Sequence, residues 1–188
     1  MQDGKPSARM SRAEVGSMVE QLTSFVNRGL TLVTWNGLAF DFDVLAEESG
    51  LSSDCAELAL DHVDMMFHAV CRLGHRLSLG KAAEGLGVGE KTGSGSEAPA
   101  MWAAGRFDEV LGYNVQDARL TLAVAEEAQR RGQLVWITGK GVARSMPLSG
   151  GWCSVRDACS LPLPDTSWMD HPPSRADFMK WLPPGMRA

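Results

Sequence analysis

The sequence lacks several features that would point to a membrane, secreted or strongly basic protein. No stretch of about 18 uninterrupted apolar residues occurs in its 188 residues, so we expect no membrane span. The first residues, MQDGKPSARMSR, have neither the apolar segment nor the small-residue cleavage site of a secretory signal. The four cysteines are scattered, which is typical of free thiols in a reducing compartment. We therefore expect a cytoplasmic protein.

Positive charge is also scarce. The formal net charge is −5, whereas proteins that hold long nucleic acids by electrostatics are normally basic. Any contact with nucleic acid must therefore be local, such as a short end or a single strand held at a metal site. The apolar share of 44% is ordinary and predicts a domain with a real core.

Local patterns predict an α/β protein with three parts. Residues 1–10 resemble a loose leader, residues 11–133 form the main domain, and residues 134–188 form an extension rich in tryptophan and proline. Ser11 and Glu14 form a capping box for a first helix that ends near Gly29. Further segments follow in this order: a buried strand at 30–35, a helix from 40 to 50, a strand at 61–67 leading into a short helix, a helix at 77–86 stopped by Gly85 and Gly87, a mobile or tightly turned loop at 89–96, a long helix at 108–131 ended by Gly132, and a strand at 134–138 with a turn at 139–141.

The extension has two interpretations. It is too apolar to be disordered and too rich in proline to be helical throughout. It either wraps over the domain or serves as an arm that docks on a partner.

Two motifs place polar side chains where chemistry is expected. Asn36-Gly-Leu-Ala-Phe40-Asp41 follows the first strand, and open α/β sheets carry their ligand sites beyond the carboxyl ends of strands. Tyr113 and Asp117 are four residues apart on a helix, so both side chains project from one face. Each motif also has a plainer explanation, since Asp41 could be a first-turn acid and the helix face could be solvated.

Taken together, the motifs resemble the DEDD-type 3′–5′ exonucleases of the tyrosine subclass. The similarity covers roughly residues 12 to 130 and is strongest to the proofreading domain of family B DNA polymerases and its stand-alone bacterial relatives. In that family N-x3-F-D is the second exonuclease motif and Y-x3-D-A-x-L is the third, here Tyr113 to Leu120. The resemblance implies a ribonuclease H-like mixed sheet with flanking helices.

The resemblance also implies the roles of individual residues. Asp41 and Asp117 would hold Mg²⁺ or Mn²⁺ in a two-metal centre. Tyr113 would orient or help deprotonate the attacking water, and Asn36 and Phe40 would seat the terminal nucleotide. The implied partner is a single-stranded or 3′ end of DNA or RNA. Several positive side chains could line a path for the strand, or could be ordinary solvated surface: Arg72, His75, Arg76, Lys81 and Lys91.

One departure from the family is important. The first motif, Asp-x-Glu, is absent before Ser11, so two of the four acids and the N-terminal strands are missing. The strand at 30–35 would then have an open inner edge. Three explanations stay open: a fragment or misplaced start of a longer protein, an edge covered by the strand at 134–138 or by a second copy of the chain, or a shortened inactive relative. The rival to an exonuclease is a non-catalytic nucleic-acid-binding or assembly module.

Overall fold

The computed structural model of the chain describes residues 10–91 and 95–187. Most of the expected leader, residues 1–9, therefore lies outside the described residues, as does the middle of the loop expected at 89–96. Within the described part, no helix combines the length and the apolar character needed to cross a membrane.

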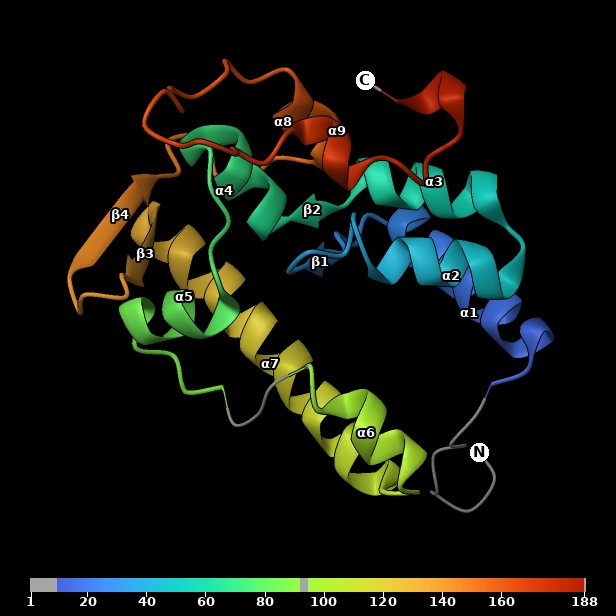
Figure 1. Cartoon of the computed structure of the whole chain (residues 1–188). Coiled ribbons are helices and arrows are strands. Elements are labelled where there is room, and N and C mark those ends of the chain that lie inside the picture. The colour runs from blue at the N-terminus through green and yellow to red at the C-terminus, as the bar shows by residue number, and fades with distance from the viewer. Residues whose placement is uncertain (1–9, 92–94, 188) are drawn as a thin grey trace.

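The first half of the chain places a small parallel strand pair among helices (Figure 1). Strand β1 pairs with β2 in parallel, with Val33 opposite Val63 and Thr34 opposite Asp64. The elements are α1 (Arg12–Asn27), β1 (Val33–Thr34), α2 (Asp41–Ser49), α3 (Ser52–Asp61), β2 (Val63–Asp64) and α4 (Met65–Leu73).

The second half adds the longest helix and an antiparallel hairpin. Helix α7 runs diagonally below the strand pair, with α6 beside its first turns (Figure 1). The elements are α5 (Leu79–Leu86), α6 (Ala98–Ala103), α7 (Phe107–Arg131), β3 (Gln133–Ile137), β4 (Ala143–Pro147), α8 (Val155–Cys159), α9 (Arg175–Phe178) and a short 3-10 turn (Pro184–Met186).

The helices predicted from local signals are confirmed. Ser11 and Glu14 form both bonds of the capping box, and Gly50 and Gly132 end their helices in the left-handed conformation. Gly85 has a different role from the predicted one, since it lies inside α5 and only Gly87 caps it. A Cβ at Gly85 would lie 2.5 Å from the backbone of Trp136, so glycine is required there for α5 to pack on β3.

The predicted buried strand at 30–35 is only partly correct. Just two of its residues pair in β1, and Leu30 is 56% exposed. The idea that the strand at 134–138 covers the open edge is wrong, because β3 pairs with β4 in a separate sheet. A buried central strand needs neighbours on both sides, and among the described residues β1 pairs only with β2.

The core consists of two apolar clusters on either side of the parallel strands. One gathers α1–α4 with α8 and α9, and the other gathers α5, α7 and the β3–β4 hairpin. Trp35 packs against both clusters, and its indole N–H donates to the Leu77 carbonyl at 3.2 Å. This side chain thus ties the two halves together where β1 ends.

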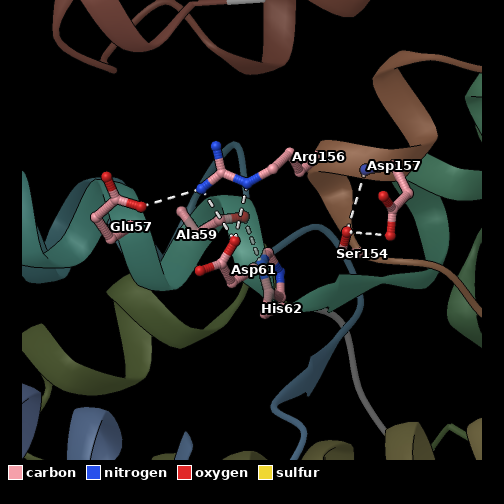
Figure 2. A network of polar contacts seen from close by, with 7 residues as sticks. All are labelled: Glu57, Ala59, Asp61, His62, Ser154, Arg156 and Asp157. Carbon is pink, nitrogen blue, oxygen red and sulfur yellow. Dashed lines mark hydrogen bonds and ion pairs between the residues drawn. The ribbon is translucent and has the colours of Figure 1, made fainter. Parts of the chain in front are cut away.

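The C-terminal segment packs on the first cluster. Val155, Phe178 and Leu182 are at most 1% exposed. Figure 2 shows a polar network at this contact, in which Arg156 of α8 pairs with Glu57 and Asp61 of α3, each at 3.0 Å. The apolar side chains bury the larger surface, so they and not the exposed ion pairs stabilise the contact.

Candidate functional site

A cleft of about 1340 Å³ lies between the end of β1 and the first half of α7. One wall comes from β1 and the start of α2, and the opposite wall comes from α6 and α7. The structure brings the five residues predicted from the two motifs to this one cleft: Asn36, Phe40, Asp41, Tyr113 and Asp117. Their chemical roles stay predictions.

The turn that carries the first motif is held by a buried carboxylate. Asp64, 1% exposed at the end of β2, accepts hydrogen bonds from the backbone N–H of Asn36 at 3.0 Å and of Leu38 at 2.9 Å. It also caps α4 by accepting from the N–H groups of Met66 and Phe67, both at 3.0 Å. Burial raises the pKa of Asp64, and these four bonds oppose the rise.

The conformation of Asn36 is unusual. Its φ of 76° lies in the left-handed region, which asparagine tolerates better than most residues. Its side-chain Oδ1 is buried without a hydrogen-bond partner among the described residues. An unpaired buried acceptor costs free energy, so this side chain adds strain at a residue that lines the cleft.

The start of α2 presents an aromatic ring and a carboxylate to the same space. Phe40 is 62% exposed, which leaves its ring available for stacking. Asp41 lines the cleft and is close enough to Asp64 for the two charges to interact. Reduced hydration and the charge of Asp64 raise the pKa of the Asp41 carboxyl.

On the opposite wall, Asp117 is engaged by a lysine. The Lys91 ammonium donates to Asp117 Oδ2 at 2.6 Å and lies 5.3 Å from the centre of the Tyr113 ring. Burial opposes the charge on Lys91, but its hydrogen bonds to Asp117 and Tyr113 outweigh this and raise its pKa. Burial also raises the pKa of Tyr113, partly offset by Lys91, so this phenol is protonated at neutral pH.

These residues do not on their own fit a two-metal centre. Asp41 and Asp117 offer the oxygen ligands that Mg²⁺ and Mn²⁺ prefer. However, within residues 10–91 and 95–187 no three His, Cys, Asp or Glu side chains gather in a way that could hold a metal ion. Asp64 is committed to four backbone N–H groups, and Asp117 is paired with Lys91.

Other cleft residues could contact a nucleotide. Trp102 of α6 lines the cleft and packs edge-on against Phe107, with ring centroids 4.5 Å apart. Of the positive residues considered for a strand path, Arg76 and Lys91 line the cleft. Trp102 was not among the site residues predicted from sequence.

Comparison with known proteins gives one match. The family model of the RNase H superfamily matches residues 5–129, about two thirds of the chain. No match emerged from comparison with curated proteins or with solved structures. The matched range includes both walls of the cleft.

Proposed function

The chain belongs to the RNase H superfamily, and we propose that it is a 3′–5′ exonuclease-like protein that takes the end of a nucleic-acid strand in the cleft. Membership of this superfamily by itself indicates nuclease-type activity and nucleic-acid binding in general. The finer proposal rests on one observation: the N-x3-F-D and Y-x3-D motifs, about 70 residues apart in sequence, line one cleft.

We assign each cleft residue a task that its surroundings allow. The exposed ring of Phe40 would stack on the terminal base or sugar, with Trp102 on the opposite wall as a second aromatic surface. Asn36, which also lines the cleft, would help to seat the end of the strand. Arg76 and Lys91 would meet phosphate oxygens.

Tyr113 would orient the attacking water by hydrogen bonding. A phenol whose pKa is raised stays protonated, so it can donate a hydrogen bond but is a poor base at neutral pH. Asp41 and Asp117 would supply negative oxygen atoms at the reacting end. The described residues do not complete a two-metal centre.

A second candidate is a non-catalytic nucleic-acid-binding module on the same scaffold. The Lys91–Asp117 ion pair favours it, because it removes one of the two acids from metal binding. The two candidates differ in what they require: hydrolysis needs Asp117 as a reactive group, whereas binding does not.

The test is digestion of a 5′-labelled single-stranded oligonucleotide by the purified chain, with Mn²⁺ and with EDTA, beside an Asp117→Ala control. Binding of the same oligonucleotide is measured in EDTA by fluorescence anisotropy. A ladder that shortens from the 3′ end, and is lost in EDTA and in Asp117→Ala, would support the exonuclease. Binding without shortening would support the binding module, and the absence of both would refute the two proposals together.

A further inference from the structure

A lysine stands at the place on Asp117 where a divalent ion would be expected in an exonuclease site. The Lys91 ammonium lies 2.6 Å from Asp117 Oδ2, and the two side chains are only 29% and 25% exposed. Partial burial strengthens such a pair relative to a fully solvated one. One oxygen of Asp117 is therefore already neutralised within the chain itself.

The lysine is packed into this position from more than one side. Its Cβ lies 3.5 Å from where a Cβ at Gly80 of α5 would stand, so its stem rests on the first turn of that helix. On the α7 side its ammonium reaches both Asp117 and Tyr113. Gly95 also lies close to the Tyr113 side chain, since a Cβ at Gly95 would lie 3.5 Å from the Tyr113 hydroxyl. Lys91 thus bridges α5 and α7 and is not a freely solvated surface lysine.

We propose that Lys91 is the resident cation of the cleft and takes the place on Asp117 that a divalent ion would have in the family's metal chemistry. Two positive charges on one carboxylate repel each other, so ion and ammonium compete. Lysine is suited to such an exchange because its ammonium is a point charge on a flexible four-carbon stem. This accounts for the mismatch between the family's metal chemistry and the residues that line this cleft.

The test measures ion binding directly and needs no nucleic acid. Tb³⁺ is titrated into the purified full-length chain, and its luminescence is followed by excitation of the protein's aromatic side chains, of which Trp35, Trp102 and Tyr113 line the cleft. Lys91→Met removes the ammonium and keeps the stem. It should bind Tb³⁺ about tenfold more tightly than the wild type, which corresponds to about 1.4 kcal/mol. Lys91→Arg keeps the charge and should bind like the wild type.

The double variant Lys91→Met with Asp117→Asn locates the effect. It should lose the gain, because the carboxylate that Lys91 released is gone. Equal affinities of the wild type and Lys91→Met would overturn the proposal, as would a gain that survives Asp117→Asn. Thermal melting of each variant controls for folding, and Lys91→Gln repeats the test if Lys91→Met is unstable. A chain that never cuts an oligonucleotide but shows these affinities would still support the role of Lys91, so the two proposals fail separately.

Discussion

Removing the Asp64 carboxylate should lower the free energy of unfolding by more than the loss of a single helix cap would. The carboxylate is 1% exposed and accepts four backbone hydrogen bonds, two from the turn after β1 and two from the first turn of α4. Asp64→Ala deletes all four at once. The lost helix cap costs about 0.5–2 kcal/mol. The N–H groups of Asn36 and Leu38 are left in the interior, and each unsatisfied buried donor costs about 1–3 kcal/mol.

The sum for Asp64→Ala is about 2.5–8 kcal/mol, a large part of the roughly 5–15 kcal/mol that stabilises a typical domain. Asp64→Asn should cost less, about 1–2 kcal/mol, because one side-chain oxygen still accepts hydrogen bonds. In Asp64→Asn, the side-chain NH₂ faces one of the backbone N–H groups that the carboxylate bound. No orientation of the asparagine therefore accepts hydrogen bonds from all the N–H groups of the turn and of the helix cap.

Urea unfolding followed by tryptophan fluorescence measures these losses at pH 7. Asp54→Ala is the matched control, because Asp54 is an exposed acid in the first turn of α3 and should change stability by less than about 0.5 kcal/mol. A loss below about 1 kcal/mol for Asp64→Ala would refute the view that this carboxylate holds the turn.

Four further expectations follow from other parts of the structure. Burial lowers the pKa of His62 to about 4, below its unfolded value of about 6.5, so its stabilising contribution is complete above pH 6.5 and is lost as the pH falls towards 4. Between pH 7 and pH 5, the free energy of unfolding of His62→Gln should fall by about 2 kcal/mol less than that of the wild type. Urea unfolding at both pH values measures this, and equal falls would contradict the prediction. Asn36→Gly should keep or raise the melting temperature, because glycine accepts a φ of 76°, yet weaken oligonucleotide binding in anisotropy; unchanged binding would remove Asn36 from the site. Asp41→Asn should raise the melting temperature by about 1–3 °C at pH 7, since the raised pKa of Asp41 means that its charge is destabilising. That gain should vanish below about pH 3.8, where both forms are neutral, and a gain that persists there would exclude this cause. Phe178→Ala should cost about 3–5 kcal/mol in urea unfolding and Arg156→Ala less than about 1 kcal/mol, and the reverse order would show that ion pairs dock the C-terminal segment.

The elements that could be predicted from sequence are those with strong local signals. The capping box at Ser11 and the glycines at 50 and 132 mark helix ends through backbone chemistry that does not depend on distant residues. Both motifs were also recognisable, because each is contained in a few consecutive residues. Their meeting in one cleft agrees with the order of elements that the resemblance implied.

Several helices were missed. Helix α3 does carry a local signal, because its exposed acids Asp54, Glu57 and Asp61 recur every three or four positions opposite its buried residues. Helix α6 is six residues long and is held on α7 by the contact of Trp102 with Phe107. Such short helices gain little from intrinsic propensity, so sequence patterns give no reliable sign of them.

Contacts between distant residues account for the unforeseen parts of the site. Asp64 bonds to residues 26 and 28 positions earlier, and Lys91 pairs with Asp117 26 positions later. Each of these residues has an ordinary local explanation, as a helix cap or a surface charge. Only the folded chain shows that Asp64 supports the turn of the N-x3-F-D motif and that Lys91 pairs with Asp117 of the Y-x3-D motif.

The C-terminal segment, which the sequence left without a clear role, reaches the cleft through Arg76. The Arg76 guanidinium lies 4.7 Å from the centre of the buried Phe178 ring, while the same residue lines the cleft. A cation over an aromatic face is attracted to it, so α9 helps to fix a positive group where a strand would pass. Lys91 is fixed from the other side by Asp117. A chain with a net charge of −5 thus keeps two cations at the cleft. This local balance is what an acidic protein needs to accept the end of a polyanion.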